Sequence, residues 1–307
     1  MIICCGEALI DMLPRTATTG EPAWAPYSGG AVFNSAIALG RLDVPVEFFC
    51  GLSSDLFGEQ LRASLAASKV GSRFAPISAR PTTLAFVHLV DGHASYVFYD
   101  ENTAGRMLSK DDLPDLGLDV DAMLFGAISL IPEPCGSTYE ALMARECTSR
   151  VIMLDPNIRP AFIPDRDKHL ARMNRMVAMA DIVKLSDEDL KWFGETGGID
   201  EIAASWLERG PKLIVVTRGS QGATGYTRSH HVTVKPQPVT VIDTVGAGDT
   251  FNAGILASLH DQGVLSKPAL AELSEASIRS ALTLGAAAAA VTVSRAGANP
   301  PWRHELD

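Results

Sequence analysis

From about residue 121 to its end, the chain alternates short apolar segments with amphipathic ones, and this alternation limits the possible folds more than any other feature. Apolar runs at 122–129, 151–157, 181–186 and 212–219 have the length of buried strands, and helical patterns separate them. Strands that alternate with helices predict a mostly parallel sheet that is covered on both faces. The N-terminal run 1–10 is a further apolar strand candidate.

Polar residues stand at or just after the ends of several predicted strands. They are Asp11, Asn157, Ser186 and Gly219. Ligands of open α/β sheets bind at the carboxyl ends of the strands. The repetition therefore predicts a binding site at this edge of the sheet.

Two stretches near the N-terminus do not follow the alternation. Residues 82–100 form two apolar or alternating runs around Asp91-Gly92, which predicts a β-hairpin. Residues 12–33 are rich in Pro, Gly, Thr and Ser and have no helical period, so we interpret them as irregular. Together the two stretches could form a small sheet beside the main body.

Composition excludes several classes of protein. The 307 residues allow two domains or one large α/β domain. Acidic residues number 36 and basic residues 26, a net charge of −10 that argues against nucleic acid or an anionic membrane as the main partner. The five cysteines form no CxxC pair and indicate buried thiols in a reducing compartment.

The N-terminus and the longest apolar stretch both predict a cytoplasmic protein. Glu7 and Asp11 interrupt the first apolar run, which therefore does not read as a signal peptide. The stretch 285–293 is too short and too rich in alanine to span a bilayer.

The strongest chemical signal is the glycine-rich helix start at 243–251. Gly246, Ala247 and Gly248 precede an apolar helix, and free N–H groups at a helix start form an anion hole. Asp249 follows in the first turn. It could be only a capping residue, or it could be a general base beside a site that stabilises a transferring phosphoryl group.

Other motifs of nucleotide chemistry are missing from the sequence. It has no GxxxxGK[ST] phosphate loop, no GxGxxG after the first strand, and no HRD and DFG pair. A second glycine cluster, at 28–34, leads into a helix. It is either an ordinary loop capped by Asn34 or a place where the backbone approaches a polar small molecule and the Asn34 amide meets its hydroxyls.

The two glycine clusters resemble the paired signatures of the ribokinase-like, or PfkB-type, carbohydrate kinases. The first is GGAVFNSAIALGRL at 29–42 and the second is DTVGAGDTFNAG at 243–254. The resemblance continues at 6–12, 155–160, 216–223 and 294–301, so it covers essentially the whole chain. The segments GEALIDMLP, RPTTLAF, YDENTA and DPNIRP are most similar to bacterial fructokinases.

The resemblance implies a ribokinase-like α/β fold: a three-layer sandwich with a mostly parallel central sheet and a small β-sheet lid. Residues 12–33 and 82–100 would form the lid, and 1–11, 34–81 and 101–307 the large domain. A lid would exclude water from phosphoryl transfer. Its exposed face would pair two chains into a homodimer.

The resemblance also implies roles for the residues of the motifs. Asp249 would be the catalytic base, and the amides of Gly246, Ala247 and Gly248 the anion hole. The substrate would be bound by Asp11, Gly29, Gly30, Asn34 and Asn157. The nucleotide would be bound by Arg159, Lys184, Thr217, Gly219 and Gly222. Arg159 could instead form a surface ion pair, and Lys184 could be a solvated lysine.

The resemblance also implies binding sites for two metal ions. Many members of the family carry NxxE where this chain has Ser186 and Asp189, so either Glu188 or Asp189 would order Mg²⁺ through water. A potassium ion would lie near Asp243, Ser294 and Gly297.

The resemblance therefore implies an ATP-dependent sugar kinase that converts D-fructose to fructose 6-phosphate, with ATP and Mg²⁺ as cofactors and K⁺ as an ion that the family commonly binds. A 2-keto-3-deoxygluconate kinase or another sugar kinase of the family is the alternative, since these subgroups share Asp11, Gly29, Gly30 and Asn34. A non-catalytic sugar-binding regulator would be expected to lose the base or the anion hole, and both are present.

Overall fold

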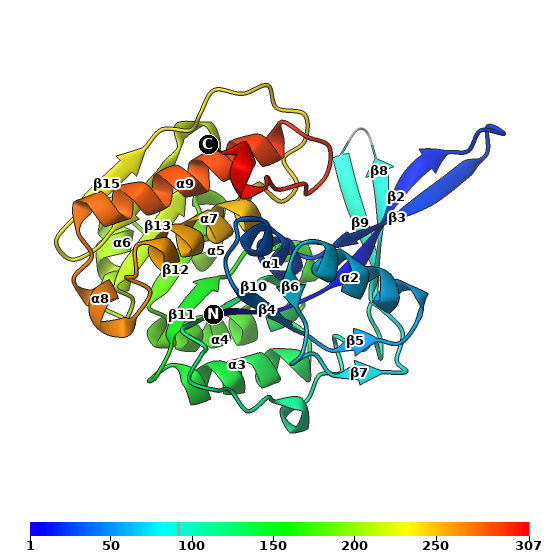
Figure 1. Ribbon diagram of the computed structural model, residues 1–307, viewed down its shortest axis with the longest axis horizontal. Helices are drawn as coiled ribbons and strands as arrows, with labels where there is room; N and C mark the ends of the chain where they lie inside the picture. Colours follow the sequence, from blue (N-terminus) through cyan, green and yellow to red (C-terminus); the bar gives the residue numbers. More distant parts are fainter. Residues whose placement is uncertain (91–92, 307) are drawn as a thin grey trace.

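A nine-stranded sheet forms the centre of the molecule (Figure 1). The computed structural model describes residues 1–90 and 93–306, so the predicted Asp91-Gly92 turn lies outside the described residues. The strand order is β15-β14-β13-β12-β11-β10-β1-β4-β6, and only the β13-β14 and β14-β15 pairs are antiparallel. The predicted mostly parallel sheet is therefore confirmed. Its strands are β1 (Ile2–Cys5), β4 (Val46–Phe49), β6 (Val70–Gly71), β10 (Ala122–Gly126), β11 (Val151–Asp155), β12 (Ile182–Ser186), β13 (Leu213–Thr217), β14 (Ala223–Tyr226) and β15 (His231–Val234).

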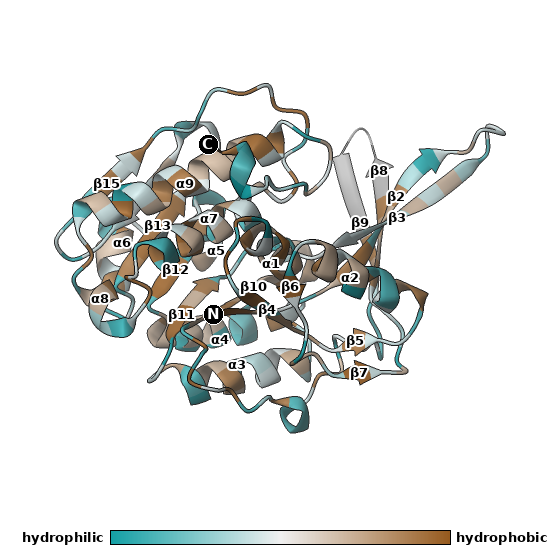
Figure 2. Cartoon of the chain, in the orientation of Figure 1, coloured by the Kyte–Doolittle hydropathy of each residue, from teal (hydrophilic) through white to brown (hydrophobic). Residues whose placement is uncertain are grey.

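Helices cover both faces of this sheet and bury two apolar clusters. Successive side chains of β1 point to opposite faces of the sheet. Ile2 and Cys4 therefore belong to one cluster, and Ile3 and Cys5 belong to the other cluster. Figure 2 shows that the strands of the large sheet are predominantly hydrophobic. One face carries α1 (Ala31–Arg41), α2 (Leu56–Ala67), α7 (Ala247–Asp261), α8 (Lys267–Ala271) and α9 (Glu275–Val293). The other carries α3 (Cys135–Glu146), α4 (Arg166–Met179), α5 (Asp187–Phe193) and α6 (Ile199–Leu207).

A separate four-stranded sheet stands beside this body (Figure 1). It consists of β2 (Leu9–Thr16), β3 (Pro22–Gly29), β8 (Leu84–Val90) and β9 (His93–Tyr99), in the order β3-β2-β8-β9. The expected small sheet is confirmed, but the interpretation of 12–33 as irregular is wrong, because most of this stretch pairs as β2 and β3 over eight positions. The signal was hidden because both strands extend into solvent, where neither side has to be apolar.

The small sheet has an inner face and an outer face. Asp11 and Phe98 share the inner face, since both lie opposite Ala85, and both line the cavity described below. The outer lid face consists of Met12, Trp24, Phe86, Val97 and Tyr99. Three of its members, Trp24, Val97 and Tyr99, are 48–61% exposed.

The remaining elements are short. A two-stranded sheet pairs β5 (Leu52–Ser53) with β7 (Ile77–Ser78), and the 3-10 turns are η1 (Lys110–Asp112), η2 (Ala127–Leu130), η3 (Pro160–Phe162), η4 (Gly219–Gln221) and η5 (Arg303–Glu305).

Among the helices of the described residues, only α9 is long and apolar enough to span a membrane. Its Ile278, Ala281 and Leu282 belong to the apolar cluster under the large sheet. A Cβ at Gly254 of α7 would lie 2.5 Å from the Cα of Gly285 in α9, so the two helices pack backbone against backbone. The helix is therefore a packed part of the core.

Candidate active site

Asp249 lies at the start of helix α7, where the glycine-rich segment ends. Gly246 is the N-cap with a φ of 78°, a conformation that glycine adopts without strain. The Asp249 side chain is buried, with 7% exposure, and burial raises its pKa from an ordinary 3.8 to about 7. Asp155 and Glu7 also raise the pKa, whereas the hydrogen bond from Asn34 and the charge of Lys184 lower it. A carboxylate with a pKa near neutrality suits a general base.

Asn34 holds the Asp249 carboxylate in place. Its Nδ2 donates to Asp249 Oδ2 at 2.9 Å, and Ser35 Oγ donates to the Asp249 carbonyl at 3.0 Å. Asn34 is not a helix cap, because α1 already begins at Ala31 with Gly30 as its N-cap. The Asn34 amide, expected from the sequence to lie near the hydroxyls of a substrate, is thus bonded to the carboxylate that is expected to be the base.

A cavity of about 460 Å³ opens beside Asp249. It brings together most of the residues that sequence reasoning assigned to the base, the anion hole and the substrate, although they come from distant parts of the chain. These are Asp11, Gly30, Asn34, Asn157, Gly246, Gly248 and Asp249, and Arg159, which was assigned to the nucleotide, lines the same cavity. The small sheet and the large domain therefore both contribute to its wall.

Asp11 projects from β2 into this cavity. Burial raises the pKa of its carboxyl to about 6. Gly29, on the neighbouring strand, is not itself part of the lining, but a Cβ there would lie 2.2 Å from Asp11 Oδ2. The glycine therefore leaves the space that the Asp11 carboxylate occupies.

The anion hole differs in one detail from the expectation. Gly246 and Gly248 line the cavity, whereas Ala247 does not. The Ala247 N–H donates to the Thr244 carbonyl at 3.3 Å. Gly246 and Gly248 are therefore the better candidates for contact with a phosphoryl group.

Lys184 lies behind the start of α7 and not at the surface. It is 4% exposed, and its Nζ is 3.0 Å from Asp155 Oδ2. Asn252 of α7 donates to the same oxygen at 2.7 Å. The alternative of a solvated lysine is therefore wrong, and the expected contact of Lys184 with a nucleotide stays a prediction.

The other predicted nucleotide residues lie at two places. Arg159 is exposed at the cavity, and its guanidinium donates to the Ile158 carbonyl at 3.0 Å. Thr217, Gly219 and Gly222 lie at the end of β13, beyond the lining of this cavity. Since β13 pairs with β12, this turn lies beside the strand end that carries Ser186.

The two carboxylates proposed for magnesium have different surroundings. Asp189 is buried in the capping box of α5, where Ile158 N, Ser186 N and Ser186 Oγ all donate to it. Glu188 is exposed. The described residues contain no group of three His, Cys, Asp or Glu side chains that could hold a metal.

The residues proposed for potassium lie where two loops meet. Asp243 accepts from Val245 N at 3.0 Å and from Gly297 N at 2.9 Å. Ser294 caps the end of α9, and its Oγ donates to the Val291 carbonyl. Asp243 thus ties the loop before the anion hole to the loop after α9.

Glu7 was not assigned a role from the sequence, although it follows the first strand directly. Its Oε1 accepts from Ala31 N at 2.8 Å and its Oε2 from Ser129 N at 3.2 Å. Glu7 therefore joins the start of α1 to the turn after β10. A carboxylate directly after Gly6, the glycine that follows the first apolar run, was the signal that could have identified it.

Glu7 also separates the cavity from a second one of about 400 Å³. The two cavities share Leu9, Ile128 and the ring pair Phe98 and Phe162, whose centroids are 4.6 Å apart. This pair is a contact between the small sheet and the large domain.

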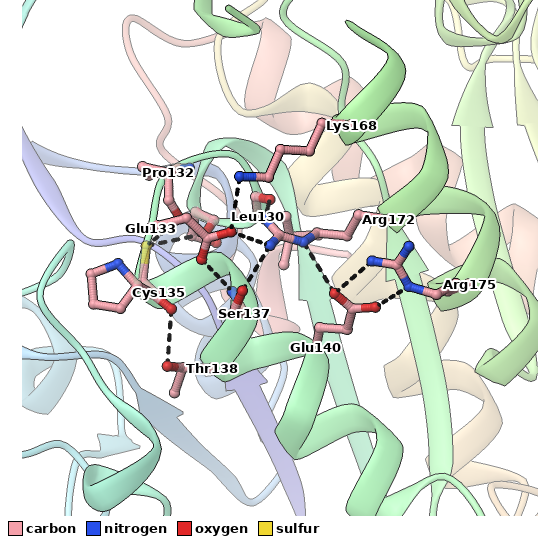
Figure 3. A network of polar contacts seen from close by, with 12 residues as sticks. Leu130, Pro132, Glu133, Cys135, Ser137, Thr138, Glu140, Lys168, Arg172 and Arg175 are labelled. Atoms are coloured by element: carbon pink, nitrogen blue, oxygen red, sulfur yellow. Dashed lines mark hydrogen bonds and ion pairs between the residues drawn. The ribbon is translucent and has the colours of Figure 1, made fainter. Parts of the chain in front are cut away.

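A network around Arg172 supports the wall of the second cavity (Figure 3). Arg172 of α4 is 5% exposed and donates to the Leu130 carbonyl, Ser137 Oγ, Glu133 and Glu140. These bonds fix the chain between η2 and α3, which supplies several lining residues.

The comparisons with known proteins agree on one family. A model described as pfkB family carbohydrate kinase matches residues 1–305. A fructokinase of Rhizobium leguminosarum bv. trifolii is 60% identical over 279 residues, which are 91% of this chain and 86% of that protein.

Solved structures resemble the fold over nearly its whole length. A fructokinase from Xylella fastidiosa with bound ATP has a TM-score of 0.90 at 30% identity, covering 99% of this chain and 97% of that chain. A Vibrio cholerae O395 fructokinase with fructose, ADP and a calcium ion has a TM-score of 0.83 at 27% identity, covering 97% and 94%. A double mutant of the Vibrio enzyme, with potassium in place of calcium, has a TM-score of 0.84 at 26% identity, covering 97% and 93%.

Proposed function

The chain belongs to the pfkB family of carbohydrate kinases, and on this premise we propose that it is a fructokinase, which transfers the γ-phosphoryl group of ATP to D-fructose and forms fructose 6-phosphate. The observation that carries the choice of sugar is the 60% identity to a fructokinase over 91% of the chain. The 2-keto-3-deoxygluconate alternative has no comparable support. A non-catalytic regulator is not favoured either, because Asp249, Gly246 and Gly248 share one cavity.

Asp249 acts as the general base in this proposal. It accepts the proton of the sugar hydroxyl, whose oxygen then forms a bond to the γ-phosphorus while the bond to the leaving oxygen of ADP breaks. The hydrogen bond from Asn34 occupies Asp249 Oδ2 and fixes the orientation of the carboxylate. The amides at Gly246 and Gly248 and the start of α7 stabilise the charge of the transferring group.

The sugar is held from the side of the small sheet. The Asp11 carboxylate and the Asn157 amide both line the cavity and can bond adjacent hydroxyls of a polyol. We propose that 12–33 and 82–100 form a lid distinct from the large domain. The lid residue Phe98, packed on Phe162, would help to keep water from the phosphoryl group.

ATP would lie between Arg159 and the turn with Thr217, Gly219 and Gly222. The planar guanidinium of Arg159 suits a phosphate. Mg²⁺ would neutralise charge on the phosphates of ATP, and we propose that the exposed Glu188 orders its water ligands, since Asp189 is engaged by three protein donors. Asp243, Ser294 and Gly297 are the candidates for a monovalent ion.

We propose further that the enzyme is a cytoplasmic homodimer joined through the outer lid face. Exposed apolar and aromatic side chains gathered on one face of a sheet are typical of an interaction surface. The net charge of −10 does not favour nucleic acid or a membrane as a partner.

The test of the function is a coupled ADP-release assay with ATP, Mg²⁺ and a panel of sugars. We expect the highest kcat/KM with D-fructose, and an Asp249→Asn preparation serves as the control for contaminating kinases. Turnover of 2-keto-3-deoxygluconate without turnover of fructose would contradict the proposal.

Asp11→Ala tests the sugar site. The variant should raise the KM for fructose at least about tenfold, because a lost hydrogen bond to a charged group weakens binding by about 1.5–3 kcal/mol. The KM for ATP should stay unchanged. An unchanged KM for fructose would remove Asp11 from the site.

A further inference from the structure

A buried polar cluster beneath the anion hole has no part in the transfer as described so far. Lys184 from the middle of β12 and Asn252 from α7 both donate to Asp155 Oδ2 at the end of β11. All three residues are at most 4% exposed. The side-chain amide oxygen of Asn252, Oδ1, is buried and has no hydrogen-bond partner in the described part of the chain. Burying an ion pair costs desolvation free energy that the attraction between the two charges often does not recover. A role in the reaction would explain why the pair lies at this place.

The ammonium of Lys184 lies directly behind Gly248. A Cβ built on Gly248 would be 3.1 Å from Lys184 Nζ. Because glycine carries no side chain, nothing of residue 248 but backbone separates this charge from the cavity that Gly248 lines. The Asp155 carboxylate uses one of the three donors of the ammonium.

Lys184 is the buried cation among several carboxylates. Burial alone would lower the pKa of Lys184, but Asp155, Asp189 and Asp249 raise it overall, so the side chain stays charged. The charged or titratable groups that act on Asp249 or share its cavity are Glu7, Asp11, Asp155, Arg159 and Lys184. Of these, Arg159 is exposed, so its charge is screened by solvent.

We propose that Lys184 is a positioning residue of phosphoryl transfer: its buried ammonium, anchored by Asp155 behind Gly248, keeps Asp249 in the ionised form that accepts the proton of the sugar hydroxyl. The inference rests on the proposed role of Asp249 as the base. Lys184 acts through the carboxylate and does not touch the sugar.

The experiment is the pH dependence of kcat/KM for fructose at saturating ATP and Mg²⁺, which reports the ionisation of groups in the enzyme before fructose binds. Lys184→Gln should move the acidic midpoint about one pH unit upward, because an opposite charge close to a carboxyl lowers its pKa by about one to three units. Lys184→Arg keeps the charge and should keep the wild-type midpoint, even if kcat falls.

A second pair of variants distinguishes the expected shift of the midpoint from an effect of misfolding. Lys184→Gln leaves Asp155 buried without its counter-ion, so the same change is also made in an Asp155→Asn background. The double variant replaces the ion pair by two neutral amides of similar shape, and its midpoint should lie above that of Asp155→Asn alone. Fructose affinity without nucleotide, measured by calorimetry, should stay at the wild-type value.

A merely structural role predicts a different result. Lys184→Gln would then lower the melting temperature and kcat but leave the midpoint unchanged in both backgrounds, and this outcome overturns the inference. Failure of the proposed function is separable, because the wild type would then not turn over fructose, whereas near-wild-type turnover in purified Asp249→Asn would remove only its role as the base.

Discussion

At the scale of single residues, the identity of the base is the first matter to test. Asp249→Asn keeps the shape of the side chain and can keep the bond from Asn34, but it removes the proton acceptor. We expect kcat to fall about 10²–10⁴-fold, with fructose binding largely intact. Coupled-assay kinetics together with calorimetry check both parts. Turnover near the wild-type rate would assign the base to another residue.

The raised pKa of Asp249 also has a consequence for stability. A carboxyl whose pKa rises from 3.8 to about 7 on folding binds more protons in the folded state, so its contribution to stability falls as the pH rises through this window. Asp249→Asn should therefore melt at a higher temperature than the wild type at pH 8. The difference should shrink as the pH falls through this window and vanish only below the ordinary pKa of 3.8, where the carboxyl is protonated in both states. Thermal melts across this range measure it, and a variant less stable than the wild type at pH 8 would speak against a strained carboxylate.

The sequence indicated which motifs to look at but not the contacts between their residues. Asp11, Asn34 and Asp249 come from separate motifs and line one cavity in the structure, while their assigned roles stay predictions. The bond between Asn34 and Asp249 could not be predicted, since it joins residues 215 positions apart. The burial of Lys184 was missed because a lysine in an apolar strand has no visible partner until Asp155 is placed beside it.

At the scale of elements, helix α4 offers a matched pair of arginines. Arg172 and Arg175 both contact Glu140, but Arg172 is buried whereas the Arg175 side chain is 57% exposed. Arg172→Met removes the donor of the Leu130 carbonyl and one of the donors of Glu133, which still contacts Ser137 N and Lys168, and should reduce the free energy of unfolding by about 1.5–3 kcal/mol. Arg175→Met should change it by less than about 1 kcal/mol. Urea denaturation compares the two, and equal losses would refute a central role for Arg172.

The elements of the large domain were predictable, whereas those of the small sheet were only partly so. Helix α7 and strands β10 to β13 are buried in the body, so their apolar periods show in the sequence. The hairpin of β2 and β3 is exposed along much of its length, and its pairing is set by backbone bonds that leave no pattern of side chains.

At the scale of the whole molecule, the outer lid face tests the proposed dimer. Trp24 is 48% exposed and lies 5.8 Å, between ring centroids, from Phe86. Trp24→Glu would place a charge in the apolar contact and should convert a dimer to monomers at micromolar concentration. Leu118→Glu is the control, because Leu118 is fully exposed and lies outside the small sheet. Light scattering after size exclusion measures the mass, and a monomeric wild type would exclude this dimer.

The central place of β1 has a consequence for synthesis on the ribosome. This strand is synthesised first, yet it lies between β4 and β10 in the sheet. The hydrogen bond from Asn34 to Asp249 can form only after residue 249 has been added. Such long-range pairing is slow and leaves partly folded chains with exposed apolar surface. A nascent or truncated chain that lacks the last quarter keeps Asp11, Asn34 and Asn157 but has neither Asp249 nor helix α7, so on the proposed mechanism it lacks the base and cannot transfer the phosphoryl group.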